Sequence, residues 1–377
     1  MKVEKMNVSF TGNDLFRGFN LVTSIIPSSS VKNVLQGIKL MVQDQKVELT
    51  ATDLEVLARY ILPVKEYTNE GSIVLPAIRV NNILREWAGN DEVSISVGES
   101  NCTIRSKGGY FKIIGENPEQ FPEVQANNIR DFIEIDSETI SDMVGKVIYA
   151  VSTVKARSTL CGIFLRIDKD DINMVAADGN RLASVKRKVN NADDISVDGI
   201  VTAKCLSFLQ RFASECKGTL KLGMSESQIR FISEKGEVIS QLIDGKYPRY
   251  EEVIPKGNDK KAEVNKNELL SAVRMASFMT TEGYRVVKFV LKKGRLMLLS
   301  KTADVGETEL EIPATYDGAD VEICFNPDYV LDVLKVSDNE SVVIELNDGD
   351  SAAIFRPDYE HVNVIMPVEL KQGGDSL

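Results

Sequence analysis

The chain has 377 residues, 43% of them hydrophobic and 27% charged, and a formal net charge of -11. This composition is typical of a soluble globular protein with two or three domains, and an acidic total allows binding to nucleic acid only if basic residues gather on one surface. Five scattered cysteines and a single histidine disfavour a structural metal site, and no run of about 20 apolar residues is available for a membrane span. Because MKVEKMNVSF lacks the apolar run of a signal peptide, we expect a cytoplasmic protein with reduced thiols and no cofactor.

One sequence pattern occurs three times at a spacing of about 125 residues. In each copy an apolar run leads into a small-residue turn that contains an aspartate, at Asp53, Asp178 and Asp304. A Phe-Pro pair at 121–122 is matched 126 residues later by a Tyr-Pro pair at 247–248. Several matches at one offset predict tandem copies of one α+β fold. The predicted domains are 1–125, 126–256 and 257–377.

The first copy reads as two helices and about eight strands. An amphipathic helix is predicted over 13–26, and a second helix follows the strand that begins at Ile73. The apolar faces are Leu15, Phe19, Val22 and Ile26 in the first helix, and Val80, Ile83, Leu84, Trp87 and Ala88 in the second. Strands are predicted at 37–42, 46–52, 58–64, 92–97, 102–107 and 110–115.

The second and third copies repeat this order with different side chains. A helix over 137–152 has Ser137 as its predicted N-cap, and 199–214 matches 73–88. In the third copy Asn265 and Glu268 form a capping-box pattern, and Asn326 followed by Pro327 predicts the start of the last helix. Strands are predicted at 162–167, 172–177, 288–300 (a hairpin), 342–346 and 352–355.

No catalytic group of residues stands out. His361 lies in DYEHVN without a nucleophile arranged around it, so we interpret it as a surface histidine. Neither GxGxxG nor GxxxxGK[ST] occurs. Basic residues instead recur on the six predicted helices, mostly off the apolar faces, and three copies that turn these helices to one side would concentrate positive charge there. These residues are Arg17, Arg79, Arg85, Lys146, Lys204, Arg211, Arg274 and Lys335.

The order of several motifs resembles the bacterial DNA polymerase III beta subunit family, the sliding clamps. The motifs are GIKLMV, LTATDLE, NPEQFPEV, STLCGIFLRI, AADGNRLA, DGKYPRYEEVIP, FNPDYVLDVL and a closing MPVEL, and together they extend over essentially the whole chain. The resemblance implies three clamp domains per chain and a head-to-tail homodimeric ring around duplex DNA. It implies no enzymatic activity, and it implies partners that include a replicative polymerase, a clamp loader and other proteins with short clamp-binding motifs.

The resemblance also implies three sets of site residues. A partner-peptide groove between the second and third domains would contain Leu160, Ala177, Gly179, Asn180, Arg181, Leu182, Pro248, Val253, Asn326, Tyr329, Ala352, Val364, Ile365, Met366, Pro367 and Val368. The residues expected to face DNA are Lys32, Arg79, Arg85, Lys155, Arg157, Lys204 and Arg211. The residues expected at the dimer seam are Phe111, Ile113, Phe278 and Met279.

The sequence departs from the family pattern at the groove. Asn180 stands where a histidine is frequent, and Glu252 and Glu369 stand where arginine is usual, so an acidic partner residue should be received less well. The tail KQGGDSL extends beyond the usual MPxxL end. Two alternatives remain: a clamp-fold scaffold that binds proteins without encircling DNA, and a hydrolase that uses a carboxylate with His361.

Overall fold

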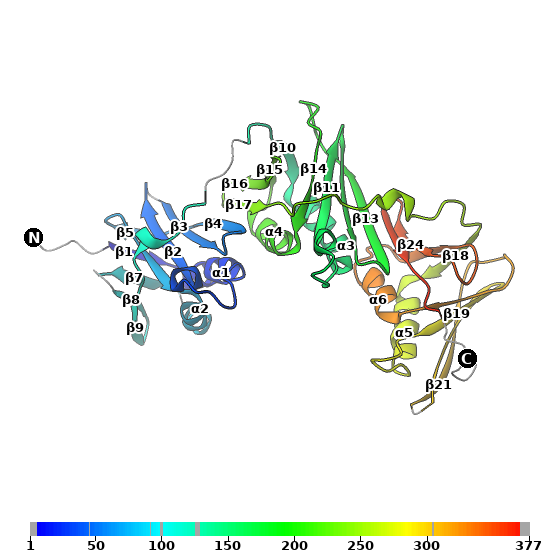
Figure 1. Ribbon diagram of the computed structural model, residues 1–377. Helices are drawn as coiled ribbons and strands as arrows, with labels where there is room; N and C mark the ends of the chain where they lie inside the picture. Colours follow the sequence, from blue (N-terminus) through cyan, green and yellow to red (C-terminus); the bar gives the residue numbers. More distant parts are fainter. Residues whose placement is uncertain are drawn as a thin grey trace, which may run out of the picture. The chain divides into compact units, whose positions relative to one another are not determined.

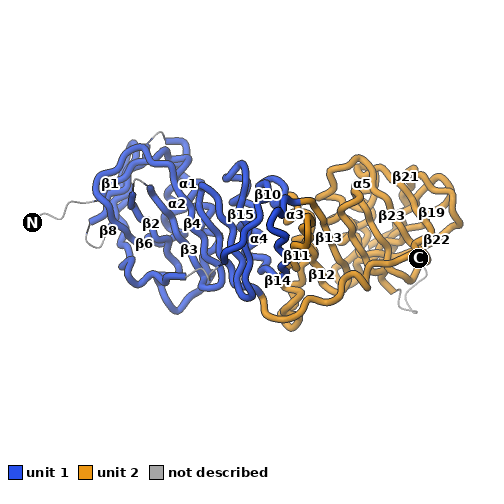
Figure 2. The backbone as a smooth tube through the Cα atoms, turned by 90° about the horizontal axis from the view of Figure 1, so that it is seen from above, with its two compact units in different colours: residues 1–141, 189–242 blue, residues 142–188, 243–377 orange. Residues whose placement is uncertain are grey.

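A computed structural model describes residues 6–44, 46–90, 92–98, 101–124, 129–303 and 305–369. Asp304 and the tail KQGGDSL lie outside the described residues. The chain forms two compact units (Figure 2). Unit 1 comprises residues 1–141 and 189–242, and unit 2 comprises residues 142–188 and 243–377.

The described part of the chain contains six α-helices, two for each copy of the sequence pattern (Figure 1). They are α1 (Gly12–Thr23), α2 (Ala77–Glu86), α3 (Ser137–Val147), α4 (Ala203–Cys216), α5 (Lys266–Ser277) and α6 (Pro327–Lys335). Each lies within or beside a segment that the periodicity predicted.

The described part of unit 1 contains two antiparallel sheets. The first has the order β5-β1-β7-β8-β9 and the second the order β10-β15-β16-β17-β4-β3-β2-β6. The strands of the first sheet are β1 (Met6–Phe10), β5 (Glu66–Thr68), β7 (Val93–Val97), β8 (Asn101–Ser106) and β9 (Gly109–Ile114). Those of the second are β2 (Gly37–Gln43), β3 (Lys46–Thr52), β4 (Val56–Leu62), β6 (Gly71–Pro76), β10 (Ile133–Asp136), β15 (Thr219–Met224), β16 (Gln228–Ser233) and β17 (Gly236–Gln241). Because β4 pairs with β17, this sheet joins segments from the first and second sequence copies. A further strand, β14 (Val197–Thr202), leads into α4.

Unit 2 repeats this plan. Its strands run in the order β11-β12-β13-β25-β24-β23-β18 in one sheet and β21-β20-β19-β22 in the other. The first set comprises β11 (Gly162–Asp168), β12 (Asp171–Ala177), β13 (Arg181–Lys188), β18 (Lys260–Asn265), β23 (Ser341–Leu346), β24 (Ala353–Asp358) and β25 (His361–Ile365). The second comprises β19 (Val287–Lys292), β20 (Arg295–Thr302), β21 (Gly306–Pro313) and β22 (Val321–Phe325). Here β13 pairs with β25, which joins the second sequence copy to the third.

The repeated aspartate holds a tight turn. The Oδ1 atom of Asp53 accepts hydrogen bonds from the backbone N–H groups of Glu55 (3.0 Å) and Val56 (2.8 Å). Asp178 accepts in the same way from Asn180 (2.8 Å) and Arg181 (3.0 Å). An aspartate that bonds its own backbone two and three residues onward favours such a turn. The recurrence therefore has a structural cause in the turns before β4 and β13.

Most of the helix starts agree with the sequence prediction. Asn265 caps α5 by accepting from the N–H groups of Asn267 and Glu268, and Asn326 caps α6 with Pro327 at its first position. The prediction for α3 was wrong. The Oδ2 atom of Asp136 accepts from the N–H groups of Glu138 and Thr139. The Ser137 hydroxyl instead accepts from the N–H of Gly218.

The helices pack their apolar faces on the sheets. Helix α1 contacts β3 and β4 in unit 1, and α5 contacts β20 and β21 in unit 2. Leu15, Phe19 and Val22 are fully buried, as predicted, but α1 ends at Thr23, so Ile25 rather than Ile26 reaches the core.

In α2 the predicted apolar face is only partly buried. Val80 and Leu84 are fully buried, while Ile83, Trp87 and Ala88 are partly exposed. The helix ends at Glu86, so its last two predicted core residues lie beyond it. The amide Asn81 is buried instead, and its Nδ2 donates to the side-chain oxygen of Asn20 on α1 (3.4 Å).

The cysteines are free thiols. All but Cys161 are buried, and burial raises the pKa of Cys102 and of Cys205 to about 12. In the described ranges, no group of three or more His, Cys, Asp or Glu residues is placed to hold a metal ion. No helix within those ranges is long and apolar enough to cross a membrane.

Candidate functional site

Unit 2 contains an apolar groove with a volume of about 230 Å³. Strand β13 and the segments after β12 and β25 supply much of its lining, and the Tyr-Pro segment that begins at Tyr247 closes it. The lining residues are Leu160, Ala177, Gly179, Arg181, Leu182, Tyr247, Pro248, Tyr250, Val253, Val364 and Met366. A mostly apolar concavity of this kind suits side chains of an extended peptide.

The groove wall depends on pairing between segments that are distant in sequence. Leu182 lies opposite Val364 in the β13–β25 pair, and both are buried. The backbone N–H of Met366 donates to the carbonyl oxygen of Asn180 (2.9 Å), which continues the contact past the end of β25. Met366 itself is 41% exposed. Its side chain is therefore accessible to a ligand in the groove.

Aromatic rings support one side of the groove. The ring of Phe164 on β11 stacks on Tyr247 at 5.3 Å and lies 6.0 Å from Tyr250. The Tyr250 hydroxyl accepts from Asn173 Nδ2 (2.7 Å), and burial raises the pKa of Tyr250 to about 12. Neither tyrosine was among the predicted groove residues. The repeated Tyr-Pro pair was the signal that could have identified Tyr247.

Gly179 is required by the groove turn. Its φ is +98°, which L side chains rarely adopt, and a Cβ at this position would lie 2.2 Å from Arg157 Nη1. Arg157 Nη1 donates to the carbonyl oxygen of Asp178 (3.0 Å). The close approach of Arg157 to the turn therefore depends on glycine at position 179.

Arg181 is held by its own chain. Its guanidinium contacts Asp178 (Nε–Oδ2, 3.1 Å) and Asp332 on α6 (Nη1–Oδ2, 2.8 Å) and also donates to the carbonyl of Tyr149. It lies 4.6 Å from the ring centre of Tyr329, and its side chain is only 12% exposed. We interpret Arg181 as fixing the groove edge to α6, because its charge is already compensated by two carboxylates.

Nine of the sixteen predicted groove residues line the hollow, and the other seven are not part of its lining. Ile365 is fully buried in the core of unit 2, because it points to the opposite face of β25 from Val364. Asn180 Nδ2 is 3.5 Å from the hydroxyl of Tyr329, Asn326 caps α6, and the N–H of Val368 donates to the carbonyl of Cys324 (2.8 Å). Ala352 and Pro367 are partly exposed outside the lining.

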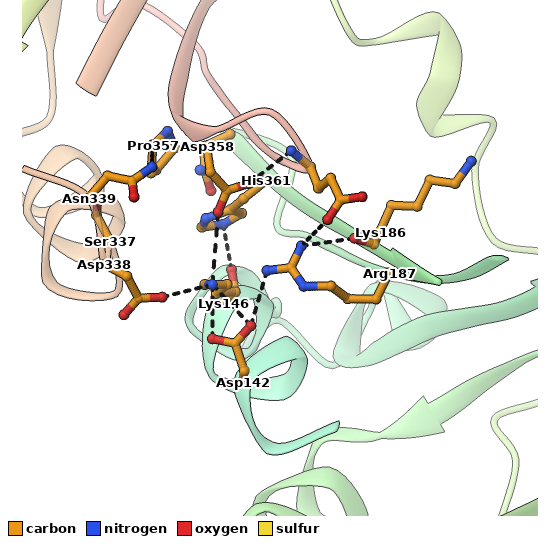
Figure 3. A network of polar contacts seen from close by, with 12 residues as sticks. Asp142, Lys146, Lys186, Arg187, Ser337, Asp338, Asn339, Pro357, Asp358 and His361 are labelled. Atoms are coloured by element: carbon orange, nitrogen blue, oxygen red, sulfur yellow. Dashed lines mark hydrogen bonds and ion pairs between the residues drawn. The ribbon is translucent and has the colours of Figure 1, made fainter. Parts of the chain in front are cut away.

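The interpretation of His361 as a surface residue was wrong. The side chain is fully buried, and its Nε2 lies 3.0 Å from the carbonyl oxygen of Lys146 (Figure 3). Burial, opposed by Asp358 and by this hydrogen bond, lowers the pKa of His361 to about 4. A buried histidine bonded to a backbone carbonyl is neutral near pH 7 and holds structure.

Lys146 does not face solvent either. Its ammonium contacts Asp142 (2.9 Å), Asp338 (2.9 Å) and Asp358 (3.9 Å), and its side chain is 6% exposed (Figure 3). Burial lowers the pKa of Lys146, but hydrogen bonds to Asp142 and Asp338 outweigh it, so the pKa lies above the usual value. The sequence interpretation of Lys146 as an outward cation was therefore wrong, because two of its three carboxylate partners, Asp338 and Asp358, are about 200 residues away in the sequence.

The residues expected to face DNA fall into exposed and paired groups. Arg79 and Arg85 are exposed on α2, and none of the described residues forms an ion pair with them. On α4, Lys204 pairs with Asp53 and donates to the carbonyl of Ile25 (2.8 Å). The others are exposed: Lys32, Lys155, Arg157 and Arg211. Arg211 also reaches the carbonyl of Asn20 on α1 (3.3 Å).

The seam candidates differ in exposure. Phe111 is 45% exposed on β9, which is an edge strand, and Phe278 at the end of α5 is 64% exposed. Ile113 is only 5% exposed, because its side chain points to the core side of the sheet. Its neighbour Ile114 points to the opposite side and is 82% exposed. Met279 is partly buried. Exposed apolar groups on a sheet edge are typical of surfaces that another chain covers.

Three family models match the chain in succession. They describe the N-terminal, central and C-terminal domains of the DNA polymerase III beta subunit and match residues 6–125, 134–249 and 251–369. The matched ranges follow the three copies of the sequence pattern.

Curated proteins and solved structures match over nearly the full length. The beta sliding clamp of Chlamydia muridarum is 29% identical over 371 residues, which cover 97% of this chain and 99% of that protein. The beta sliding clamp of Pseudomonas putida is 27% identical over 369 residues, with 97% and 100% covered. The structure of a DNA polymerase III beta subunit from Bartonella birtlesii bound to griselimycin is 28% identical, has a TM-score of 0.89 and covers 97% of this chain and 100% of that one.

Proposed function

This chain belongs to the DNA polymerase III beta subunit family, and from that premise we propose that it is a sliding clamp that encircles duplex DNA and tethers a replicative polymerase to it. The observation that carries the proposal is the succession of three clamp domains over residues 6–369. We place the boundaries between the three proposed domains after residues 125 and 256. Such a protein acts on DNA in the cytoplasm by binding, without catalysis.

The closed form is a head-to-tail homodimer. The exposed edge strand β9 with Phe111 and Ile114 supports a seam, and the exposed Phe278 at the end of α5 supplies the apolar partner surface. Backbone groups of an edge strand that pair with another chain are removed from solvent. Two copies joined at two such seams close a ring.

Contacts with DNA are few and independent of sequence. Arg79, Arg85 and Arg211 are exposed on helices and can reach phosphates, whereas Lys204 is already paired with Asp53. Phosphate contacts position a protein on the duplex without reading bases. Weak contacts of this kind suit a clamp, because tight ones would stop sliding, and the ring itself supplies persistence.

The apolar groove binds short linear motifs of the polymerase, the clamp loader and other partners. Its lining by Leu182, Val364 and Met366 favours leucine or aromatic side chains of an extended segment. The exposed carboxylates Glu252 and Glu369 make an acidic residue next to the motif unfavourable. The groove therefore discriminates partners by apolar fit first and by charge second.

Topological binding is tested by retention on DNA. The protein is placed on nicked circular plasmid by a matched clamp loader and passed through a sizing column. Retention on the circle, and loss within minutes of cutting the plasmid at a single site, is the expected result. A control plasmid cut before loading should retain nothing. Retention that is equal on circular and linear DNA, or absent from both, would instead favour the clamp-fold scaffold that binds proteins only.

A further inference from the structure

Unit 1 contains a second hollow, of about 600 Å³, on the sheet that joins β4 to β17. We propose that this charged hollow is a second peptide-binding site, one that takes an acidic segment. The internal repeat and the charges on the floor of the hollow support this proposal, which does not depend on closure of the ring.

The two hollows are built at corresponding positions of the repeat. In the groove Leu182 lies opposite Val364, and in the charged hollow Leu57, which precedes Leu182 by 125 residues, lies opposite Ile239. Each pair lies where strands from two successive sequence copies meet, and each lines its hollow. The Phe-Pro pair at 121–122 borders one hollow as the Tyr-Pro pair at 247–248 borders the other. The fold therefore presents the same concavity twice.

The charged hollow differs from the groove at two positions that correspond in the repeat. In the groove, Phe164 stacks against Tyr247 and approaches Tyr250, so aromatic rings occupy one side. The repeat counterparts of Phe164 and Tyr250 are Lys39 and Val124, and both line the charged hollow. A lysine and a valine cannot form that aromatic stack. The result is a wider hollow, 600 Å³ against 230 Å³, with a cationic group in place of an apolar floor.

The floor is a row of side chains across four adjacent strands. Lys39 on β2 pairs in register with Thr50 on β3, Thr50 with Arg59 on β4, and Arg59 with Glu237 on β17. Residues in register on neighbouring strands point to the same face of a sheet. These four groups are therefore held about one strand spacing apart, roughly 4.8 Å from one to the next. Arg230 on β16 lies in register with Ile239 and extends the floor.

The two carboxylates of the floor, Glu237 and Glu48, already have partners within the chain. Glu237 accepts from Arg230 (Nε–Oε2, 2.7 Å) and from Arg59, and it is 8% exposed. Glu48 accepts from the Thr50 hydroxyl (2.8 Å) and lies 3.8 Å from Arg59 Nε.

The Lys39 ammonium, in contrast, forms no ion pair with any described residue. The floor thus has three cations and two carboxylates, and Lys39, Arg59 and Arg230, which carry the N–H donors, all line the hollow. An anionic side chain satisfies these donors, because hydrogen bonds from ammonium and guanidinium groups to carboxylates are the stronger kind.

The occupant that fits is an extended segment with acidic residues on either side of an apolar one. In an extended chain, residues two apart point the same way. A Glu-x-Leu-x-Glu arrangement would place leucine on Leu57 and Ile239 and its carboxylates near Lys39 and Arg230. The exposed Glu123 at the rim opposes a larger cluster of negative charge, so a short acidic segment fits better than an acidic tract.

The test uses end-blocked, fluorescein-labelled heptapeptides Ser-Glu-Ser-Leu-Ser-Glu-Ser and their Gln and Lys counterparts, titrated into the full chain at low salt. The Glu peptide is expected to bind about fivefold more tightly than the Gln peptide, the upper range for an exposed ion pair, and more tightly still than the Lys peptide. Lys39→Glu should abolish the preference for Glu, and Lys39→Gln should reduce it. The matched control is Lys46→Glu, an equal charge change at an exposed position on β3 outside the hollow.

Two further results would overturn the proposal. One is equal affinity of the Glu and Gln peptides, or no measurable binding of either at millimolar peptide. The other is a Glu preference that survives Lys39→Glu and is lost in Met366→Ala, because that pattern would assign the peptide to the groove of unit 2. Circular dichroism of each variant establishes that it is folded, and plasmid retention, measured in parallel, reports separately on the clamp function.

Discussion

Leu182 lies directly opposite Val364 across the β13–β25 pair, and the two side chains line the same groove although 181 residues separate them in the chain. This relationship makes the groove conditional on tertiary structure, since it forms only when the last strand docks against the second sequence copy. Leu182 is 3% exposed and supports the fold as well as the groove, whereas Met366 is 41% exposed and is free to contact a ligand.

Replacing Met366 by alanine should weaken partner-peptide binding. A short extended peptide with a leucine and an aromatic residue, the side chains that the apolar lining favours, is expected to lose about 2 kcal/mol of affinity, the range for a central anchor. The double change Leu182→Ala and Met366→Ala should lose at least as much and also lower the free energy of unfolding. Fluorescence titration gives the affinity. Met275→Ala is the matched control, because Met275 is 44% exposed on α5 outside the groove lining, and an equal loss in that variant would contradict the site.

Neutralising helix cations should reduce the salt dependence of DNA binding. The variant carries glutamine at Arg79, Arg85, Lys204 and Arg211. Each phosphate contact that is lost lowers the slope of log affinity against log salt by about 0.9. Because Lys204 is paired with Asp53, it should contribute less than the arginines.

The control places glutamine at three exposed lysines on strands and turns of unit 1, Lys46, Lys107 and Lys221, and so removes three charges where the helix variant removes four. Its slope should equal that of the parent protein. A slope that is unchanged in the helix variant would show that these side chains do not face the duplex. In the helix variant, the affinity for duplexes of different sequence should fall by the same factor, because phosphate contacts carry no sequence information.

Charge at the seam should separate the dimer. Phe278→Glu together with Met279→Glu places two carboxylates where an apolar edge is proposed to dock, and leaving charges unpaired in a buried interface is costly. Sedimentation should give folded monomers. Tyr359→Glu is the control, since Tyr359 is a 91% exposed aromatic side chain in the turn between β24 and β25 and lies on neither β9 nor α5. A dimer that persists in the double variant would place the seam elsewhere.

The local elements could be read from the sequence because their signals are local. Apolar periodicity located the helices, and the caps at Asn265 and Asn326 were visible as side chains that bond nearby N–H groups. The Asp178 turn recurred at the repeat spacing for the same reason, since its hydrogen bonds reach only three residues onward.

Burial of single polar residues could not be predicted in the same way. Lys146 faces Asp338 and Asp358, which lie about 200 residues away in sequence, so nothing near Lys146 distinguishes it from a solvated helix lysine. Ile113 and Ile114 are equally apolar, and only the packing of β9 decides which of them is exposed. Tyr247 and Tyr250 were not predicted in the groove, because their packing against Phe164 on β11 is a tertiary contact that leaves no local signal in the sequence.

His361 should make stability fall in acid. Its pKa is about 4 in the folded chain and about 6.5 when unfolded, so below pH 6.5 the unfolded state binds a proton that the folded state rejects. The contribution of His361 to the free energy of unfolding is fully present above pH 6.5 and is lost as the pH falls toward 4. At about 1.4 kcal/mol per pKa unit, the loss amounts to about 3 kcal/mol. Urea unfolding at pH 7 and pH 4.5 measures most of this difference.

His361→Gln isolates this contribution, because glutamine can still donate to the Lys146 carbonyl but does not titrate. Asp142, Asp338 and Asp358 remain in both proteins, so acid still destabilises the variant through its carboxylates. The parent should therefore lose more stability between pH 7 and pH 4.5 than the variant, by about 2 kcal/mol or more. Parallel pH profiles would mean that His361 is accessible to protons in the folded chain. The same variant should keep its retention on circular DNA, because the proposed clamp acts by binding and His361 is buried away from any ligand. A loss of retention with normal stability would indicate a functional role for the imidazole.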